Sequence, residues 1–286
     1  MVQNMSNGPR ALSGLHDLGR HFTHVLLDIY GVLHSGGPVF PEALRCLKAL
    51  QQHKKHVTLF SNAPRLVPDI ASSLAKIGID PSLYQTVLSS GIHVKSSLES
   101  DDSFPLGRRF YHLGVHARLL DKAGYACVSS LQEADFILLT GPDKAWSYPQ
   151  DYETFFAQAL ELTRPVVCAN PDPYVMLEGE KALCAGTLGR MYETMGGRVL
   201  WYGKPYKAFY EMALDMLGVP KDQVVAVGDS MWTDIEGATS VGLASVLILT
   251  TGVHQEHFPQ TSSPYVASFL RDFSFQPTYV MDALAW

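Results

Sequence analysis

The chain has 286 residues and a formal net charge of −6, and 47% of its residues are hydrophobic. This length can bury a sizeable core in one large domain or two smaller ones. The mild acidity and the lack of a Lys/Arg-rich stripe argue against a basic nucleic-acid-binding surface, so nucleic acid is not an expected partner.

Cysteine usage and hydropathy indicate an intracellular setting. The four cysteines are far apart and form no C-x-x-C pair, which favours a reduced, cytosolic protein. No apolar run approaches the roughly 18 residues of a membrane-spanning helix. The N-terminal MVQNMSNGPR lacks the apolar stretch of a secretion signal. We therefore expect a cytoplasmic protein without a membrane segment.

Short β-branched runs alternate with helix-period stretches in the first part of the chain. Strands are predicted at HVLLD (24–28), HVTLF (56–60) and QTVL (85–88), and helices at 41–55 and 68–76. In the first of these helices, Leu44, Leu47 and Leu50 share one face. Such alternation is typical of a parallel sheet wrapped by helices.

The texture changes near position 100, where the polar SLESDDSFPLGRR (97–109) predicts a linker. A second α/β set follows, with strands at 109–113, 125–128, 135–140 and 165–169 and helices at 117–122 and 148–163. ETMGGRVLWYG (193–203) predicts a return linker. Strands and helices then alternate again as in the first part of the chain, with helices at 206–217 and 234–240 and strands at 223–229 and 244–250.

These elements predict one discontinuous α/β core with a second α/β unit inserted into it. We expect residues 1–97 and 198–286 to form a Rossmann-like core with a parallel sheet, and residues 98–197 to form the inserted unit.

Four polar stretches follow or precede predicted elements of the core. Asp28 ends the first strand, and Ser61 and Asn62 end the second, where they offer polar groups to an anion or act as helix caps. Lys204 lies between a glycine and a proline at the start of a helix; by itself it reads as a surface lysine. Carboxyl ends of parallel strands are where such folds bind ligands.

A late strand carries a pair of carboxylates in the sequence GDSMWTD. Asp229 lies at the end of that strand, and Asp234 lies in the first turn of the next helix. Two carboxylates placed in this way can converge on a hard cation such as Mg²⁺. Asp234 also suits the positive end of the helix dipole, so a purely structural role is open.

Taken in order, D-x-x-G-V-L, S-N, G-K-P and G-D-x-x-x-x-D resemble the motifs of the haloacid dehalogenase-like (HAD) superfamily over most of the chain. The place of the insertion resembles the NagD-like branch (class IIA), whose members carry a large α/β cap of the C2 type. VVCANPDPY (166–174) and ALCAGTLG (182–189) resemble cap segments of that branch. GLHDLGRHFTHVLLD resembles a subgroup in which an aromatic residue replaces the second aspartate of the first motif.

The resemblance implies an activity and a role for each residue. The protein would be a Mg²⁺-dependent phosphatase for a small phosphate ester, such as a sugar phosphate or a nucleotide, with Asp28 as the nucleophile that forms an aspartyl-phosphate. Mg²⁺ would be bound by Asp28, the carbonyl of residue 30, Asp229 and Asp234. The phosphoryl group would be bound by Ser61, Asn62 and Lys204. Asn170 and Asp172 would contact the substrate from the cap, although a loop-structuring role for these two residues is equally open.

Tyr30 is the departure from the pattern, because an aspartate usually stands there, protonates the leaving group and later activates water. The metal needs only the main-chain carbonyl, so Mg²⁺ binding should survive while acid/base catalysis weakens. The leaving-group proton could come from Tyr30, His34, water or no group at all. His34 has a suitable pKa but also reads as a plain loop histidine.

Tyr30 also keeps two other functions open. One is a weakly active or inactive HAD scaffold that binds a phosphorylated metabolite. The other is a 2-haloacid dehalogenase, whose D-x-Y-G-T-L motif has a tyrosine here; it ranks lower because those enzymes lack the metal and do not keep both late carboxylates. The expected partner is a small phosphorylated metabolite, and a homodimer is one option.

Overall fold

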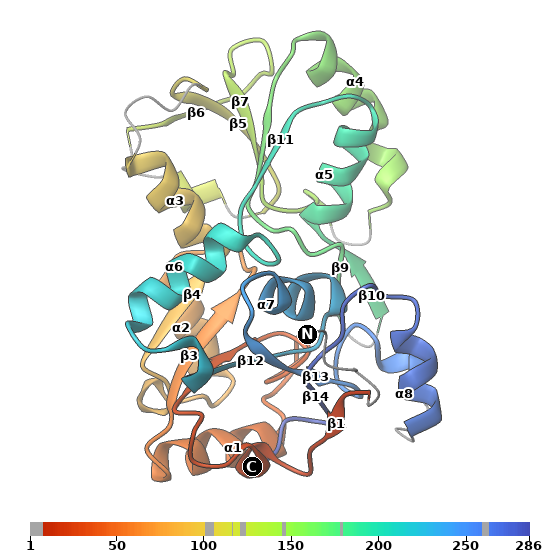
Figure 1. Ribbon diagram of the computed structural model, residues 1–286. Helices are drawn as coiled ribbons and strands as arrows, with labels where there is room; N and C mark the ends of the chain where they lie inside the picture. Colours follow the sequence, from red (N-terminus) through yellow and green to blue (C-terminus); the bar gives the residue numbers. More distant parts are fainter. Residues whose placement is uncertain are drawn as a thin grey trace.

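A computed structural model describes residues 8–100, 106–115, 117–120, 124–144, 147–177, 180–258 and 263–286. It contains two parallel sheets, one above the other in Figure 1, with helices around both. A short hairpin lies where the two layers meet. This arrangement confirms the predicted α/β class with a Rossmann-like core and an α/β cap.

The larger sheet, which we call the core sheet, has seven strands in the order β1-β14-β13-β12-β2-β3-β4, and all its pairs are parallel. Its strands are β1 (Arg10–Ala11), β2 (His24–Leu27), β3 (His56–Ser61), β4 (Thr86–Ser89), β12 (Val224–Gly228), β13 (Ala244–Ile248) and β14 (Tyr279–Met281). From the central β2/β12 pair, the next strands along the chain lie progressively outward, β3 and β4 on one side and β13 and β14 on the other. That pair is therefore a topological switch point, where α/β sheets open a crevice for ligands.

The smaller sheet, which we call the cap sheet, has five parallel strands in the order β11-β8-β7-β5-β6. Its strands are β5 (Arg109–Leu113), β6 (Ala126–Val128), β7 (Phe136–Leu139), β8 (Val166–Cys168) and β11 (Val199–Trp201). The antiparallel hairpin consists of β9 (Tyr174–Leu177) and β10 (Glu180–Leu183). The chain thus leaves the core sheet after β4 and returns to it at β12.

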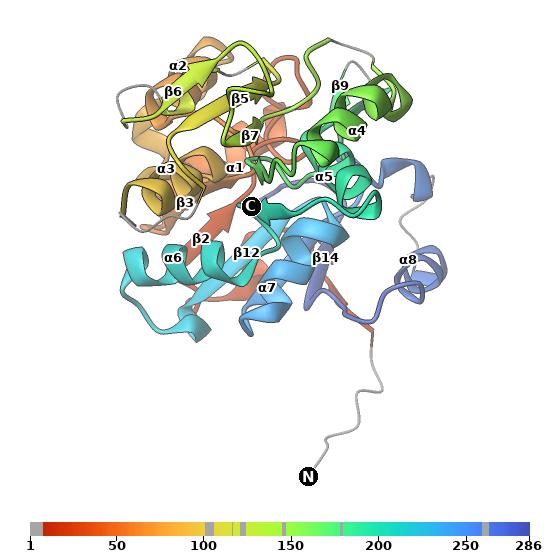
Figure 2. The same ribbon diagram turned by 90° about the horizontal axis from the view of Figure 1, so that it is seen from above.

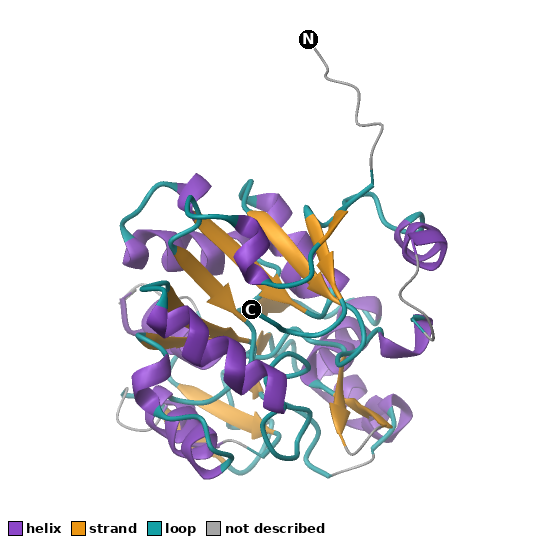
Figure 3. Cartoon of the chain, turned by 90° about the horizontal axis from the view of Figure 1, so that it is seen from below, coloured by secondary structure: helices purple, strands orange, loops and turns teal. Residues whose placement is uncertain are grey.

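Helices cover both faces of each sheet (Figures 2 and 3). On the core sheet, α1 and α2 pack on one face and α6 and α7 on the other; on the cap sheet, α4 and α5 pack on one face and α3 on the other. The helices are α1 (Pro41–Gln52), α2 (Val67–Lys76), α3 (Ser90–Ser100), α4 (Glu153–Glu161), α5 (Ala185–Thr194), α6 (Lys207–Leu217), α7 (Glu236–Ser240) and α8 (Ser263–Leu270).

Local sequence explains where the core helices begin and end. Helix α1 starts with Pro41, whose fixed φ suits a first turn, and buries Ala43, Cys46, Leu47 and Leu50 at helical spacing. Helix α6 ends at Gly218, which adopts a left-handed φ of 64°. Among the described residues, no helix is long and apolar enough to cross a bilayer.

The predicted strands and helices are found near their expected positions, but four helices differ in their ends or type. The helix predicted at 41–55 ends at Gln52, and the one predicted at 148–163 starts as a 3-10 turn (Pro149–Tyr152). The helix predicted at 117–122 is a 3-10 turn at Ala117–Leu120, and 121–122 lie outside the described residues. The helix predicted at 234–240 begins as a π-helical turn (Met231–Ile235). Three of these differences lie at element ends, where boundaries are least determined by local sequence, whereas residues 117–120 form a different type of helix. Eight strands and α-helices of the described part of the chain were not predicted: β1, β9, β10, β11, β14, α3, α5 and α8.

Both predicted linkers overlap regular structure. Residues 97–100 belong to α3, and 101–105 lie outside the described residues; residues 193–194 end α5, and 199–201 form β11. In the first, the polar run conceals Leu98, which α3 buries in the cap core. In the second, β11 pairs with β8, a contact between distant parts of the chain. The chain crosses between the sheets in α3 and after β11. The predicted limits of the inserted unit, 98–197, stay a prediction.

Candidate active site at the junction of the two sheets

Three carboxylates from two neighbouring strand ends form the floor of the site. Asp28 follows β2, Asp229 follows β12, and Asp234 lies in the π-helical turn after it; all three are buried. One ligand oxygen from each lies within 4.8 Å of the others. The switch point therefore brings Asp28 next to Asp229 and Asp234, which lie in the last third of the chain.

Lys204 provides the positive charge beneath these carboxylates. Its Nζ lies 2.8 Å from Asp28 Oδ1 and 2.7 Å from Asp234 Oδ1, and the residue is only 1% exposed. The surface-lysine interpretation is therefore wrong. Lys204 follows β11, so this cation reaches the core carboxylates from the edge of the cap sheet.

Glycines leave the space that the carboxylates fill. A Cβ on Gly252 would lie 2.0 Å from Asp229 Oδ2, and one on Gly31, whose φ is +80°, would lie 2.3 Å from the same oxygen. The Val253 N–H donates to Asp229 Oδ2 at 2.7 Å. Asp229 is therefore held between two loops that only glycine allows to approach so closely.

Asn62 connects the two sheets through its amide. Its Oδ1 accepts the Lys204 N–H at 2.7 Å, while its Nδ2 donates to the Lys204 carbonyl at 2.9 Å and to Asp172 Oδ1 at 2.8 Å. The neighbouring Ser61 Oγ accepts the Ala63 N–H at 3.1 Å. Asn62 thus holds the main chain of the buried Lys204 in place.

The cap contributes the loop Asn170-Pro171-Asp172 after β8. Asn170 Oδ1 accepts the Asp172 N–H at 3.1 Å, an Asx-type turn that matches the loop-structuring alternative for this residue. Gly186 in α5 allows the close packing of this loop, since a Cβ there would lie 2.1 Å from the Pro171 carbonyl oxygen. The turn directs Asp172 toward the core.

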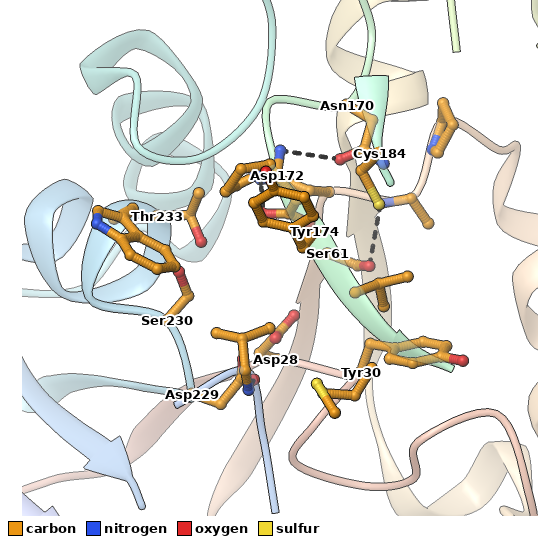
Figure 4. Close-up of a pocket in the computed structure, with 18 of the residues that line it drawn as sticks. Asp28, Tyr30, Ser61, Asn170, Asp172, Tyr174, Cys184, Asp229, Ser230 and Thr233 are labelled. Carbon is orange, nitrogen blue, oxygen red and sulfur yellow. Dashed lines mark hydrogen bonds between the residues drawn. The ribbon is translucent and has the colours of Figure 1, made fainter. Parts of the chain in front are cut away.

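A cavity of about 280 Å³ lies between the two layers (Figure 4). Of the predicted site residues, Asp28, Tyr30, Ser61, Asn62, Asn170, Asp172 and Asp229 line it, whereas Lys204 and Asp234 do not and lie buried beside its floor. The structure thus brings all the predicted site residues together in one region.

Several lining residues escaped the sequence analysis. They come mainly from the hairpin and from the loop after β12: Tyr174, Val175, Met176, Cys184, Ser230, Trp232 and Thr233. The alternating YVML and EKAL runs around a short break are a hairpin signal that could have predicted the first group. Trp232 carried no such signal, because its exposure follows from tertiary packing alone.

Burial and mutual repulsion shift the titration of the carboxylates. Burial, then the charges of Asp28 and Asp234, raise the pKa of Asp229 well above its ordinary value. Burial raises the pKa of Asp234 to about 6, against the opposing effect of Lys204. Three crowded carboxylates with one lysine leave excess negative charge, and an oxygen-only donor set of this kind suits a hard divalent cation.

Lys204 stays charged in this setting. Burial lowers the pKa of Lys204, but the carboxylates of Asp234, Asp28 and Asp172 outweigh burial and raise it well above 10.5. For Asp28, burial raises the pKa and Lys204 opposes that shift. Lys204 therefore favours the ionised form of Asp28, which is the form that can act as a nucleophile.

Tyr30 and His34 pack against each other at the side of the cavity. Their ring centroids are 4.8 Å apart in an edge-to-face contact, and His34 Nδ1 accepts the Gly36 N–H at 3.1 Å. Burial raises the pKa of Tyr30 and lowers that of His34. The Tyr30 ring points away from Asp28 in Figure 4.

The hairpin also touches the core at the rim of the site. Lys181 Nζ in β10 lies 2.5 Å from Glu256 Oε1 in the core loop after β13, and both side chains are partly exposed. An exposed ion pair of this kind is worth about 0–1 kcal/mol. It joins the two layers without burying charge.

Sequence comparison agrees with this architecture. The profile described as haloacid dehalogenase-like hydrolase matches residues 97–242, a second profile of the same description matches 25–128, and one described as HAD-hydrolase-like matches 201–286. Since the first of these spans half of the chain, the protein belongs to the haloacid dehalogenase-like hydrolases.

Curated relatives narrow the placement to the NagD-like branch. Ribonucleotide monophosphatase NagD of Escherichia coli K12 is 26% identical over 79% of this chain and 87% of its own. Dihydroxyacetone phosphatase of Corynebacterium glutamicum is 24% identical over 91% of this chain and 88% of its own, and mouse chronophin is 28% identical over 96% and 94%. These alignments include the cap as well as the core.

Solved structures share the whole fold. A haloacid dehalogenase-like hydrolase from Brucella suis superimposes with a TM-score of 0.82 and 26% identity, covering 96% of this chain and 99% of that one. NagD of Escherichia coli superimposes with a TM-score of 0.66 and 21% identity over 92% of this chain and 96% of its own, which shows the fold alone. The core-plus-cap arrangement is therefore that of this class.

Proposed function

We propose that this family member, a hydrolase of phosphoric monoesters, uses Mg²⁺ and forms an aspartyl-phosphate at Asp28. The observation that carries the proposal is the buried cluster of Asp28, Asp229 and Asp234 around Lys204 beside one cavity. A phosphoryl group carries concentrated negative charge, and catalysis of its transfer depends mostly on positioning and charge stabilisation.

Mg²⁺ would be held by Asp28, Asp229, the main-chain carbonyl of Tyr30 and Asp234, which acts as a ligand or supports the others. The convergence of the three carboxylates within 4.8 Å supports this assignment. When bound, the ion would neutralise charge on the phosphoryl oxygens. Tyr30 does not disturb this arrangement, because any residue provides the carbonyl.

Asp28 is the proposed nucleophile because the neighbouring Lys204 favours its ionised form and because it lines the cavity. Lys204 holds its Oδ1 at 2.8 Å, which fixes the orientation of the carboxylate toward the bound ester. Attack on phosphorus expels the leaving alcohol, and water then hydrolyses the aspartyl-phosphate. Ser61 and the Asn62 segment, at the start of the next loop, are the proposed contacts for the phosphoryl oxygens.

The cavity favours a small ester. Its volume of about 280 Å³ lies near the lower end of ligand pockets, and aromatic and aliphatic side chains from the hairpin form one wall. Relatives are named dihydroxyacetone phosphatase, ribonucleotide monophosphatase and sugar-phosphatase. A sugar phosphate or a nucleotide is therefore the proposed substrate class.

The test is Mg²⁺-dependent release of phosphate from 4-nitrophenyl phosphate, whose phenolate leaves without much acid assistance. We expect turnover with Mg²⁺, loss of turnover with a chelator, and a fall of about 10⁴-fold or more in Asp28→Asn. Trapping of phosphate on the parent protein, and not on the variant, would identify the intermediate. A panel of phosphate esters without any turnover at saturating Mg²⁺ would contradict the proposal.

Tyr30 favours one second candidate, a scaffold that binds a phosphorylated metabolite with little or no turnover. In that case phosphorylated ligands would raise the melting temperature of both the parent and Asp28→Asn, and neither would release phosphate. The same ester panel, read by thermal shift and by phosphate release, separates the two functions.

A further inference from the structure

The leaving-group proton has no donor among the residues of the first motif. Figure 4 shows the Tyr30 hydroxyl directed away from Asp28. A Cβ placed on Gly36 would lie 2.6 Å from that oxygen, so the hydroxyl sits against the neighbouring loop. His34 packs behind the Tyr30 ring and is not among the residues that line the cavity.

Asp172 offers a carboxyl on the opposite side of the cavity. It lies after β8 of the cap sheet and lines the same cavity as Asp28 (Figure 4). Its Oδ1 accepts a hydrogen bond from Asn62 at 2.8 Å, and the Asn170 turn fixes its backbone. The carboxyl is thus fixed in place from both sheets.

In-line displacement decides which side of the cavity matters. The attacking and leaving oxygens lie roughly opposite each other across phosphorus, so attack by Asp28 from the floor drives the leaving oxygen toward the cap. Asp172 is the acidic side chain that lines the cavity on that side, among the described residues. We propose that Asp172 is the general acid, and then the general base, of the hydrolysis proposed above.

The proton balance closes with this single residue. In the first step an Asp28 oxygen bonds to phosphorus, the bond from phosphorus to the leaving oxygen breaks, and the Asp172 carboxyl gives its proton to that oxygen. The alcohol departs and leaves Asp172 ionised. In the second step the water oxygen bonds to phosphorus from the same side, the bond from phosphorus to the Asp28 oxygen breaks, and Asp172 takes a proton from the water. This step releases phosphate, frees the Asp28 carboxylate and restores the Asp172 carboxyl.

The surroundings favour the protonated form that the first step needs. Burial raises the pKa of Asp172, whereas Lys204 and the Asn62 hydrogen bond lower it. The charged, titratable or hydrogen-bonding groups that face the carboxyl from packed elements include Lys204, Asp234, Asp28, Cys168, Cys184, Tyr210, Asn62 and Thr233. The pKa of Asp172 is thus shifted upward, in the direction that a general acid requires.

The test compares leaving groups in Asp172→Asn, which keeps an acceptor for Asn62. We expect kcat/KM for an alkyl phosphate such as glycerol phosphate to fall by about 10²–10⁴-fold, the usual contribution of a general acid. The fall for 4-nitrophenyl phosphate should stay within about 3-fold, since a nitrophenolate needs little protonation. Phenyl phosphate should lie between them.

Asp172→Glu retains a carboxyl and should recover part of the alkyl-ester activity, while Asp215→Asn on the exposed face of α6 serves as the matched control. An equal loss for all esters in Asp172→Asn, with the parent active, would overturn this inference and leave the proposed function intact. A parent without turnover on any ester would overturn the proposed function itself and this inference with it.

Discussion

The core sheet and the cap sheet are built alike but furnish different charges to the site. Strand ends of the core sheet provide the carboxylates Asp28 and Asp229, which repel each other in a buried setting. Strand ends of the cap sheet provide Lys204, after β11, and Asp172, after β8. The core strands thus concentrate negative charge, and the connection from the last cap strand to α6 brings the cation that opposes it.

This difference shows that the cap is more than a cover for the site. Lys204 arrives through the turn after β11, where Asn62 of the core holds its backbone through two hydrogen bonds. Removing one partner of a buried ion pair is costly, because the other charge is left without compensation. Stability of the core and placement of the cap should therefore be linked.

The largest expected effect comes from removing the cap's cation. Lys204→Met leaves Asp28 and Asp234 without their ion pair, so the free energy of unfolding should fall by about 3–5 kcal/mol and turnover should be lost. Lys207→Met, which breaks only an exposed pair with Glu211, should cost at most about 1 kcal/mol. Chemical denaturation measures the free energy of unfolding of both variants. Similar losses in the two would contradict the link between the stability of the core and the placement of the cap.

Two glycines test the two sides separately. Gly252→Ala forces a methyl group against Asp229, and Gly186→Ala forces one against Pro171; each should cost about 1–3 kcal/mol. Gly252→Ala should raise the Mg²⁺ concentration for half-maximal activity, whereas Gly186→Ala should lower kcat/KM at an unchanged Mg²⁺ requirement. Gly37→Ala, with open space around it, is the control. A shared phenotype would contradict this division of roles.

A smaller effect, on the pH dependence of the free energy of unfolding, is expected in α3, where the chain crosses from the core sheet to the cap sheet. His93 of α3 is buried, its Nδ1 accepts the Gly203 N–H at 3.2 Å, and burial lowers its pKa to about 4. The unfolded chain takes up this proton near pH ~6.5, so stability is full above that pH and falls as the pH drops toward 4. The slope should be about 1.4 kcal/mol per pH unit for this group.

His93→Gln keeps an acceptor for Gly203 but cannot titrate. Its free energy of unfolding, measured by denaturant at several pH values, should lose about 1.4 kcal/mol per pH unit of slope between pH ~6 and ~5. His21→Gln, at an exposed position, is the matched control substitution. An unaltered slope in His93→Gln would mean that the crossing point does not respond to acid.

Local patterns predicted most of the fold because the relevant signals are short. Strand β2 is a run of apolar residues, and α6 stops at a glycine that adopts a left-handed conformation. The end of helix α3 (97–100) and strand β11 were interpreted as parts of linkers. The polar run hides the buried Leu98, and β11 is defined by its pairing with β8, which forms only in the tertiary structure. Period and composition describe local preference, and long-range packing can override it.

The sequence by itself determined the order of the motifs, the acidic pair at Asp229 and Asp234, and the unusual Tyr30. Only the tertiary structure decided that Lys204 is buried between Asp28 and Asp234 and that Tyr30 turns away from the nucleophile. The family resemblance already implied that Asp172 faces the core from the cap, and the structure places it on the wall of the same cavity as Asp28. The physical reason is that motifs depend on neighbours along the chain. Charge pairing and in-line geometry depend on strand order and on the junction of two sheets, which bring distant residues together.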